Sequence, residues 1–375
     1  MDPIRVLHIV TSMNRGGTEN VLMNYYRQLD RNKIQFDFLL SEPNHCAFED
    51  EIIKLGGKVY RVPRMSELHL SRYIKAVNSF FKEHAEYKIV HSHISSKSTI
   101  PLWLAKHNNI PYRISHSHVD FSKHSSGQGV LVDIEKSILK IPLKRIATHY
   151  FACSKDAGIW LFGKKAMQQN KVKILYNAID AKKFNYKTEV RKIIRSQLGI
   201  SDNTCVIGNI ARFSYPKNHR FAVDVLLFFQ KQIPDICFLF VGDGELRTEI
   251  EHYAKELGVA DRCRFIGVVP NVYDYVQAMD LFIFPSFYEG LGMGIIEAQA
   301  SGLKCFASTG VPVESKVTDL VEFLPLSIGA EKWAEEISKK RDYERRGRYE
   351  EIKKAGYDAT TTVKELQDFY LDLSK

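Results

Sequence analysis

The sequence contains few cysteines and no long uncharged stretch. Its 375 residues include six cysteines at positions at least 26 residues apart, so no CxxC pair is present. A zinc site or a disulfide framework is therefore not expected, and a reducing cytoplasm suits the chain. No stretch longer than nine residues lacks Asp, Glu, Lys and Arg, so no transmembrane helix is expected. The opening residues MDPIRVLHIV lack the basic segment of a signal peptide and predict a first strand.

Excess positive charge is confined to one half of the chain. Residues 1–180 hold 26 Lys and Arg against 16 Asp and Glu, whereas residues 181–375 hold 27 against 28. A one-sided basic domain suggests a phosphorylated substrate, an anionic membrane surface or nucleic acid, and it also serves solubility alone. The rest of the composition, 45% hydrophobic and 26% charged, is that of a globular protein. The length is enough for two hydrophobic cores.

Short apolar runs alternate with stretches of helical length along the whole chain. This alternation predicts α/β domains built on parallel sheets that are covered on both faces. Two series of runs predict two doubly wound domains, with a ligand in the cleft between them at the strand C-termini. The predicted strands are 5–11, 36–40, 58–62, 89–93, 112–116, 149–152, 205–211, 236–241, 263–266, 281–284 and 304–307.

Two segments depart from this alternation. Residues 177–201 gain charge and lose apolar periodicity, which predicts a linker between the domains. Residues 331–354 are dense in charge and predict a helical stretch with a solvated face.

Gly16 and Gly17 follow the first predicted strand and begin a helix that continues with Thr18 and Glu19. Adjacent glycines allow a ligand to approach the backbone, and a helix N-terminus offers N–H groups to an anion. A phosphate-binding turn and a plain tight turn explain the segment equally well. The other glycine segment, VGDGELR at 241–247, ends in arginine instead of a third glycine and carries two acids, so it favours a strand-to-helix turn over a dinucleotide loop.

Arg212 and Lys217 lie just past a predicted strand, on a loop that faces the expected cleft. An arginine fork and a lysine point charge five residues apart can bracket a diphosphate. Solvated loop cations are the alternative, and the next segment weighs against it.

Glu289 and Glu297 flank a glycine-rich loop that leads from a strand into a helix. Carboxylates accept hydrogen bonds from sugar or ribose hydroxyls, and the backbone N–H groups between the two acids can hold phosphate, which together suit a nucleotide sugar. The loop residues between the acids are Gly290, Leu291, Gly292 and Met293.

Four histidines follow two successive strands: His91 and His93 after one, His116 and His118 after the next. In an extended strand residues i and i+2 share a face, so both members of a pair can point toward the cleft. No nearby carboxylate or cysteine completes a metal site. A structural role is favoured for His91.

The basic stretch at 136–145 interleaves cations with apolar residues. Helical spacing before Pro142 would place Lys136 and Lys140 on one face, and Lys144 and Arg145 follow. Such a stretch on a basic domain predicts either contact with anionic headgroups or an ordinary helix with its apolar side in the core.

Taken together, these residues resemble the retaining GT-B glycosyltransferases of family 4 (GT4), which include bacterial exopolysaccharide and capsule enzymes. The specific part is the E-x7-E segment with the upstream Arg212 and Lys217. Lys304 stands where the family usually has proline, in the turn after the acidic helix, and this change is expected to spare the chemistry. The resemblance covers essentially the whole chain, through GGTE, VHSHISSKS, RISHSHVD, FACSKDAGIWLFG, NAID, GNIARF, VGDGEL, FIG and FPSFYEGLGMGIIEAQASG.

The resemblance implies an acceptor-binding domain over 1–180 and a donor-binding domain over 181–359, with a C-terminal helix over 360–375 that packs back on the first. It places Glu297 on the donor ribose and Glu289 near the donor sugar. It implies His118, His116 and Glu289 as catalytic residues, with His118 favoured over His116; Gly16, Gly17, Arg212, Lys217, Gly290, Leu291, Gly292, Met293 and Glu297 as further donor-binding residues; and His93, Thr18 and Glu19 on the acceptor side.

No cofactor or metal is implied, because Arg212, Lys217 and helix N–H groups can neutralise a leaving diphosphate. The implied partners are a UDP-sugar donor and a glycan or polyprenyl-diphosphate acceptor, in the cytoplasm and at the inner face of the cell membrane. Nucleic acid is not an expected partner, since no basic motif with interleaved aromatics is present. In the front-side mechanism usually proposed, the leaving phosphate deprotonates the acceptor and Glu289 need not be a nucleophile.

Two alternatives use the same residues. A non-hydrolysing UDP-sugar 2-epimerase has the same architecture and needs no acceptor, so release of a 2-epimer from UDP-N-acetylglucosamine alone would identify it. A non-enzymatic nucleotide-sugar or polyanion-binding module would bind without turnover.

Overall fold

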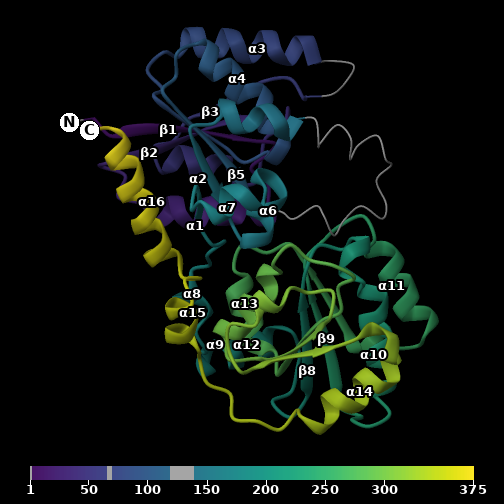
Figure 1. The fold of residues 1–375 in the computed structure, drawn as a ribbon. Coiled ribbons are helices and arrows are strands. Elements are labelled where there is room, and N and C mark those ends of the chain that lie inside the picture. The colour runs from purple at the N-terminus through teal and green to yellow at the C-terminus, as the bar shows by residue number, and fades with distance from the viewer. Residues whose placement is uncertain (1, 66–69, 119–138) are drawn as a thin grey trace. The chain divides into compact units, whose positions relative to one another are not determined.

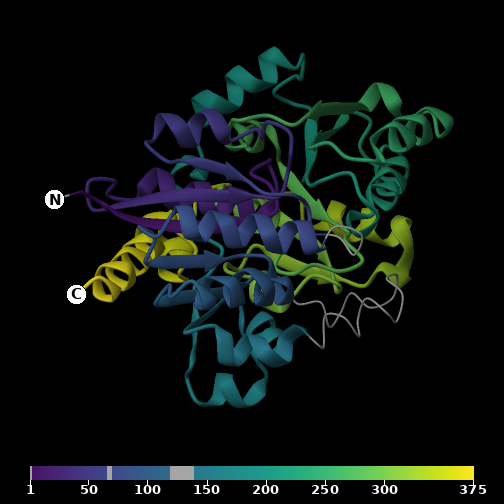
Figure 2. The same cartoon turned by 90° about the horizontal axis from the view of Figure 1, so that it is seen from above.

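The computed structural model describes residues 2–65, 70–118 and 139–375, and the chain divides into two compact units. Unit 1 is formed by Met1–Ala178 together with Ala359–Lys375, and unit 2 by Ile179–Asp358. Each unit contains one parallel sheet with helices packed against it (Figures 1 and 2). Both are Rossmann-like, so the predicted α/β fold class is confirmed.

The sheet of unit 1 has seven strands in the order β3-β2-β1-β4-β5-β6-β7. All the pairs in it are parallel, and β1 lies between β2 and β4. The strands are β1 (Ile4–Val10), β2 (Ile34–Leu40), β3 (Val59–Arg61), β4 (Ile89–Ser92), β5 (Tyr112–Ser117), β6 (His149–Ala152) and β7 (Val172–Ile174). The helices are α1 (Gly17–Gln28), α2 (Glu49–Lys54), α3 (Leu70–Glu83), α4 (Thr99–His107), α6 (Lys155–Phe162), α7 (Lys164–Gln168) and α16 (Ala359–Leu373), with a further helix over 139–146.

The sheet of unit 2 has six strands in the order β10-β9-β8-β11-β12-β13, again all parallel. The strands are β8 (Cys205–Ile210), β9 (Ile236–Val241), β10 (Cys263–Gly267), β11 (Leu281–Phe284), β12 (Lys304–Ser308) and β13 (Val321–Leu324). The helices are α8 (Ala181–Phe184), α9 (Thr188–Gln197), α10 (His219–Phe229), α11 (Arg247–Glu256), α12 (Val272–Ala278), α13 (Met293–Ala300), α14 (Gly329–Lys339) and α15 (Tyr349–Lys354).

The central strands are apolar along their whole length because both faces of each sheet are covered. Every residue of β2, sequence IQFDFLL, is buried, and so is every residue of β9, sequence ICFLFV. The one acid within β2, Asp37, accepts hydrogen bonds from Arg5 on the neighbouring strand and from the Tyr87 hydroxyl at 2.7 Å. A continuous apolar run therefore identifies a buried parallel strand, as expected.

The last helix of the chain belongs to unit 1. In Figure 1, α16 runs beside α1, and its buried Tyr370 hydroxyl lies 2.6 Å from Nδ1 of His91 on β4. This contact joins the C-terminal helix to the middle of the sheet.

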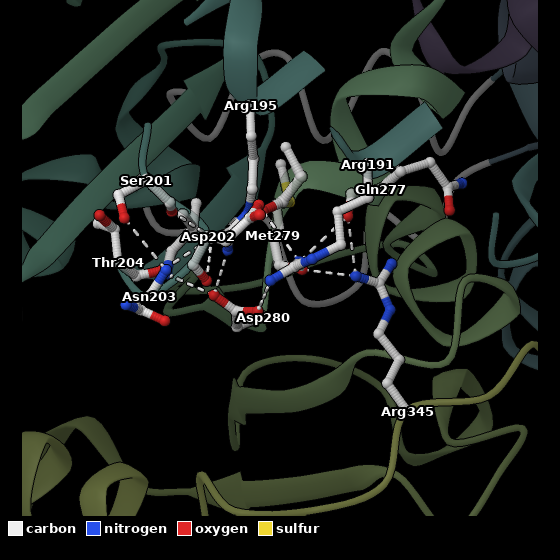
Figure 3. A network of polar contacts seen from close by, with 12 residues as sticks. Arg191, Arg195, Ser201, Asp202, Asn203, Thr204, Gln277, Met279, Asp280 and Arg345 are labelled. Carbon is white, nitrogen blue, oxygen red and sulfur yellow. Dashed lines mark hydrogen bonds and ion pairs between the residues drawn. The ribbon is translucent and has the colours of Figure 1, made fainter. Parts of the chain in front are cut away.

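The predicted linker 177–201 contains the change of unit, but most of it is part of unit 2. The change of unit falls between Ala178 and Ile179, and α9 follows within unit 2. Arg195 on α9 is 1% exposed and donates to the carbonyl oxygen of Ala278 and to the Asp280 carboxylate (Figure 3). The charge of Arg195 thus points into unit 2, whereas lysines of the same segment such as Lys182 and Lys192 are exposed.

Three arginines close the C-terminal end of α12. The last carbonyls of a helix have no partner within it, so donors must come from elsewhere. Arg191 donates to the carbonyl oxygens of residues 277, 278 and 279, and Arg345 to those of 276, 277 and 279 (Figure 3). Arg195 and Arg191 also bind the two carboxylate oxygens of Asp280 at 2.5 Å.

The predicted solvated face over 331–354 is also wrong in part. Trp333 and Ile337 of α14 are fully buried, because α14 packs on α10 while its lysines and glutamates occupy the other side. Burial lowers the pKa of Arg345 to about 10, and the carbonyl oxygens around it hold the charge. Local charge density therefore does not separate solvated segments from buried arginines in this chain.

Candidate functional site

The candidate residues gather at the carboxyl ends of the central strands of each unit. In an open parallel sheet ligands bind outside these ends, where the strand order reverses. That reversal lies between β1 and β4 in unit 1 and between β8 and β11 in unit 2. The unit 1 candidates lie in the loops after β1, β4 and β5 and, for His91 and His116, in β4 and β5 themselves; the loops after β8 and β11 and the helix α13 carry those of unit 2.

Glu289 and Lys217 form the centre of the unit 2 group. Lys217 Nζ lies 2.6 Å from each carboxylate oxygen of Glu289, and Ser286 Oγ donates to Oε1 at 2.7 Å. Glu289 is only 8% exposed. The pair spans 72 residues of sequence, and it places a cation and a carboxylate side by side at the end of β11.

Backbone hydrogen bonds fix the loops that carry this pair. The N–H of Phe287 donates to the carbonyl oxygen of Pro216 at 2.8 Å, and that of Glu289 to Gly310 at 3.2 Å. Asn218, which adopts a left-handed φ of 53°, donates from its side chain to the carbonyl oxygen of Pro285. Three separate loops are thereby held together before any ligand binds.

The loop between the two acids presents unpaired backbone donors. Within the part of the chain that the structure describes, the N–H groups of Gly290, Leu291, Gly292 and Met293 make no hydrogen bond. Gly292 caps α13 with φ 83°, and a Cβ there would lie 2.8 Å from the Phe284 ring. Gly294 brings the first turn of α13 against β8, where a Cβ would lie 2.7 Å from the carbonyl oxygen of Ile210. The result is a helix N-terminus with free donors next to Lys217.

Glu297, one turn into α13, differs from Glu289 in having no partner among the described residues. Its side chain is partly buried, and desolvation raises the pKa of this carboxyl to about 8. A carboxyl group in this setting gains most from a ligand that offers hydroxyl donors.

Arg212 lies apart from this buried pair. Its side chain is 73% exposed, and its guanidinium donates to Glu245 at 3.0 Å. The glycines of the β9–α11 loop allow this approach, because a Cβ on Gly244 would lie 2.4 Å from the carbonyl oxygen of Phe213. Both cations that were predicted to bind a diphosphate are thus paired with carboxylates. Arg212 is exposed to solvent, whereas Lys217 is partly buried.

The glycine turn of unit 1 is covered by its own acid. Gly16 caps α1 with extended backbone, and a Cβ there would lie 2.3 Å from a carboxylate oxygen of Glu19. Ser12 Oγ reaches the same carboxylate, whose pKa burial raises. Gly17 has open space where a side chain would be, and Thr18 is partly buried beside it. An anion at this N-terminus would meet the Glu19 carboxylate first.

The histidines form one buried stack. His8, on β1, joins the four predicted ones, and all five are 7% exposed or less. His8 Nδ1 lies 2.9 Å from His93 Nε2, and His93 Nδ1 lies 2.8 Å from His118 Nε2. No partner within the described residues contacts either nitrogen of His116.

The hydrogen bonds assign the ring protons. Asn177 Oδ1, 3.1 Å from His118 Nδ1, accepts, so His118 Nδ1 carries the proton and its Nε2 accepts from His93. The same reasoning makes His8 the donor to His93 and leaves His8 Nε2 bare, and this atom has no partner in the described chain. Burial lowers the pKa of His8 to about 3 and that of His118 to about 4, so the rings are neutral at pH 7.

The stack favours hydrogen bonding over metal binding. Two sets of three, His8–His91–His93 and His93–His116–His118, hold ring nitrogens within 4.8 Å of one another. The ring planes differ by 18° to 26° within the first set and by 29° to 43° within the second. In each set two of these nitrogens already hydrogen-bond to each other, His8 to His93 in the first and His93 to His118 in the second, so a metal ion would have to displace that bond.

Several functional neighbours were missed at the level of sequence. Ser286 lies inside the predicted loop, but a serine there carries no distinctive signal. His8 is one residue in an apolar strand, and only its register with His91 across the sheet reveals the stack. Asn177 and Tyr370 reach the histidines from far along the chain, at separations of 59 and 279 residues.

The predicted basic stretch at 136–145 begins outside the described residues, which exclude Lys136. Its described part is a helix over 139–146 that buries Leu143 and Ile146 and leaves Ile141 73% exposed. Lys140 Nζ lies 4.0 Å above the Trp160 ring. The apolar side of the helix therefore packs in the core, in line with the ordinary-helix alternative. Across the described residues no helix combines the length and apolarity needed to span a bilayer.

Two family models together match most of the chain. The model described as Glycosyltransferase Family 4 matches residues 15–183, and that described as Glycosyl transferases group 1 matches residues 190–353. These segments correspond to much of unit 1 and of unit 2 respectively.

Individual proteins show the same likeness over full length. A putative glycosyltransferase, EpsF of Bacillus subtilis, is 32% identical over 374 residues, covering 98% of this chain and 96% of its own. The UDP-Gal:alpha-D-GlcNAc-diphosphoundecaprenol alpha-1,3-galactosyltransferase of Escherichia coli is 23% identical, covering 81% of this chain and 79% of its own. HepE of Anabaena, solved in complex with UDP and glucose, superposes with a TM-score of 0.73 at 19% identity and covers 99% of both chains.

Proposed function

Since the chain belongs to the family 4 and group 1 glycosyltransferases, we propose that it transfers a sugar from a UDP-linked donor to a glycan or polyprenyl-diphosphate-linked acceptor. The proposed transfer retains the anomeric configuration and serves bacterial exopolysaccharide, capsule or O-antigen biosynthesis. The transferase activity follows from the family. The donor, the acceptor and the stereochemistry are the proposal, supported by the HepE complex and by the lipid-linked acceptor of the Escherichia coli relative.

The observation that carries the donor assignment is the order of groups around α13. Glu297, without a partner, suits the ribose hydroxyls; the free N–H groups from Gly290 to Met293 suit the diphosphate; and Glu289, held by Lys217, suits the sugar. Lys217 lies where it can neutralise the charge that develops on the leaving phosphate. Gly16 and Gly17 of unit 1 are also proposed to bind the phosphates, which requires the Glu19 carboxylate to move away from Gly16.

The pairing of Glu289 supports front-side attack over a covalent intermediate. Both carboxylate oxygens contact Lys217, and one also accepts from Ser286, so its electron pairs are engaged. In the proposed step the bond from the anomeric carbon to the phosphate oxygen breaks, and the acceptor oxygen bonds to the same face. The acceptor proton passes to the leaving phosphate.

The acceptor is proposed to lie over the β4 and β5 ends, by His93, Thr18 and Glu19. His118, 6% exposed, remains the preferred catalytic histidine over His116, which is 1% exposed. To contact an acceptor hydroxyl, His118 would have to release His93 or Asn177, because both of its nitrogens are engaged.

The reaction is proposed to need no metal, because Lys217 and the loop N–H groups supply positive charge at the diphosphate. Activity should therefore survive excess EDTA. Loss of activity with EDTA and rescue by magnesium or manganese would contradict this part of the proposal.

We place the protein in the cytoplasm, where nucleotide sugars are made, with peripheral contact to anionic lipid through the basic stretch. Each surface cation there would contribute about 1 kcal/mol. Changing Lys136, Lys140, Lys144 and Arg145 together to Gln should reduce co-sedimentation with anionic liposomes and leave UDP binding intact. Unchanged co-sedimentation would remove the membrane role.

The deciding experiment pairs binding with product analysis. Calorimetry with UDP tests the nucleotide, and incubation of UDP-glucose, UDP-galactose or UDP-N-acetylglucosamine with a prenyl-diphosphate N-acetylglucosamine acceptor tests transfer. Nuclear magnetic resonance of the product should show an α-linkage from an α-linked donor. A β-linkage would overturn retention, and release of a 2-epimer without acceptor would identify the epimerase instead.

A further inference from the structure

Ser308, the last residue of β12, is fully buried, and its hydroxyl group takes part in two hydrogen bonds. It donates to the carbonyl oxygen of Ser286 and accepts from the N–H of Gly310 at 3.3 Å. Both of these residues also contact Glu289. Ser286 Oγ donates to Glu289 Oε1 at 2.7 Å, and the carbonyl oxygen of Gly310 accepts from the Glu289 N–H at 3.2 Å. Ser308, Ser286, Glu289 and Gly310 therefore close a ring of hydrogen bonds that holds Glu289 by its side chain and by its backbone.

This ring joins β11 and β12 beyond the point where their regular pairing ends. Phe284 of β11 pairs with Ala307 of β12, and the next residue after β11 is Pro285, which has no N–H to donate. Beyond the proline, the Ser308 hydroxyl supplies the donor for the carbonyl oxygen of the fully buried Ser286. A buried carbonyl without a donor is unfavourable, so the hydroxyl keeps the two strand ends together.

Gly310 makes the ring possible because it has no side chain. A Cβ at this position would lie 2.1 Å from the carbonyl oxygen of Phe287 and 2.9 Å from that of Ser286. The backbone after β12 can therefore come close enough to the loop after β11 for Gly310 to reach the Glu289 N–H. The backbone of Glu289 is thus fixed from the end of β12, a strand that carries none of the predicted site residues.

The two acids of the site show what this ring does. Glu297 has no hydrogen-bond partner among the described residues, whereas Glu289 is held at its N–H and at one carboxylate oxygen. The carboxylate held in this way meets Lys217, whose Nζ lies 2.6 Å from each of its oxygens. A carboxylate with free rotation would adopt this geometry for only part of the time, so the ring prepares the ion pair in advance.

We propose that Ser308 is a positioning residue for the transfer reaction: its hydroxyl group sets the place of Glu289 and, through Glu289, that of the Lys217 ammonium group. Ser308 makes no hydrogen bond to either of them among the described residues, so its effect passes through Ser286 and Gly310. The inference rests on the proposed function, in which Glu289 meets the transferred sugar and Lys217 the leaving phosphate.

The kinetic test compares Ser308→Ala with Ser308→Thr, which keeps the hydroxyl group. Ser315→Ala is the matched control, because Ser315 is also fully buried and donates to a backbone carbonyl oxygen, that of Pro312, outside the ring. With the UDP-sugar that product analysis identifies, Ser308→Ala should lower kcat about tenfold or more. Its UDP affinity by calorimetry should stay within about twofold of the parent value. Ser308→Thr and Ser315→Ala should keep most of the activity.

A double variant tests whether Ser308 acts through Glu289. In a Glu289→Ala background the Ser308→Ala change should lower kcat no further, because the group that it positions is already gone. Urea unfolding of each variant checks that it is folded. If Ser308→Ala does not fold, Ser308→Cys takes its place, since a thiol has nearly the same shape and is a weaker donor.

A second measurement does not depend on turnover. In protein made with isotope-labelled lysine, nuclear magnetic resonance should detect the Lys217 ammonium group, whose signal is identified by its absence in Lys217→Met. An ammonium group held by a carboxylate exchanges its protons slowly with water, so this signal should be sharp in the parent protein and in Ser315→Ala. It should broaden or disappear in Ser308→Ala.

The outcomes separate the role of Ser308 from the proposed function. An unchanged kcat in Ser308→Ala would overturn the positioning role, as would a loss that adds in full to that of Glu289→Ala or that Ser315→Ala shows as well. If the parent protein transfers no sugar, the proposed function fails and the Lys217 signal decides the matter. An unchanged signal in Ser308→Ala would then overturn the positioning of Glu289, and a broadened one would support it.

Discussion

The two units bury ionisable side chains in opposite ways. Unit 1 holds five imidazoles in one stack. The hydrogen bonds that run from His8 through His93 and His118 to Asn177 include no carboxylate. Unit 2 holds arginines at the end of α12, each facing carbonyl oxygens, and two of them also bind Asp280 (Figure 3). The first group is neutral and the second is charged.

The difference follows from the chemistry of the two side chains. An imidazole loses its proton near neutral pH, so burial turns it into a neutral group that needs only hydrogen bonds. A guanidinium keeps its charge and must be given acceptors when it is buried. Unit 1 should therefore be sensitive to acid, and unit 2 should be sensitive to the removal of any one partner in its network.

Breaking the arginine network is expected to have the largest effect. Arg195→Met removes the guanidinium that donates to the carbonyl oxygen of Ala278 and to the Asp280 carboxylate, and removal of one partner from a buried pair costs about 3–5 kcal/mol. Urea unfolding should show this loss in unit 2. Arg220→Met is the matched control, because Arg220 is 57% exposed and 3.9 Å from Glu249. Similar losses in both variants would contradict the assignment.

Lys217→Met tests the charged pair at the proposed site. Removing a donor positioned at developing charge costs about 3–4 kcal/mol, so kcat/KM should fall about a hundredfold to a thousandfold. Arg212→Met should cost about tenfold, since its ion pair is exposed to solvent. Steady-state kinetics would check both, with the UDP-sugar that the product analysis identifies as the donor. If Arg212→Met lowered kcat/KM more than Lys217→Met did, the leaving phosphate would have to lie near Arg212 and not near the Lys217–Glu289 pair.

Acid should unfold unit 1 before unit 2. The folded pKa values, about 3 for His8 and about 4 for His118, lie below the ordinary value of 6.5. The unfolded chain therefore binds protons first, and stability present above pH 6.5 is lost as the pH falls toward the folded values. At pH 5 the burial of His8 and of His118 costs about 2 kcal/mol for each of these two imidazoles.

Hydrogen exchange in β1, β4 and β5, compared with β8 and β9, measures this contrast between pH 7 and pH 5. Unit 2 contains one comparable group, His219, whose pKa burial lowers to about 3. The loss of stability of unit 2 between pH 7 and pH 5 should therefore be smaller than that of unit 1. Equal acceleration in both sheets would show that the stack is not the cause.

Glu297 is the exception in unit 2, a partly buried acid without a counter-charge among the described residues, and it gives the smallest predicted effect. Its pKa of about 8 leaves it mostly protonated at pH 7, whereas ribose hydroxyls bind the carboxylate best. UDP affinity should rise about tenfold from pH 7 to pH 9, with proton release on binding. Glu297→Gln should flatten this profile, and Glu289→Ala should leave UDP affinity nearly unchanged. A flat profile in the parent protein would contradict the ribose assignment.

The sequence predicted those features that depend on local pattern. Apolar runs such as 236–241 identify buried strands because a covered parallel sheet leaves no polar face. Glu289, Lys217 and the glycine loop were predicted as a group, and the structure brings Lys217 to 2.6 Å from Glu289. Their roles in the reaction remain predictions.

The features that were missed depend on contacts between distant segments. Arg195 and Arg345 look like surface charge in a helix and a loop, and only the carbonyl oxygens of residues 276–279 explain their burial. His8 joins the histidine stack because β1 pairs with β4, and Asn177 reaches His118 from 59 residues farther along the chain. Local sequence spacing predicts neither contact.

The histidine chain has a direction, and one amide sets it. Because Asn177 presents its oxygen to His118, each ring from His8 onward donates toward Asn177, so the three hydrogen bonds share one direction. Turning that amide over would force three protons to change nitrogen together, so intermediate arrangements are excluded. Asn177 is the last residue but one before the chain leaves unit 1. The proton positions at the buried strand ends are thus an all-or-none property, decided where the backbone passes from one unit to the other.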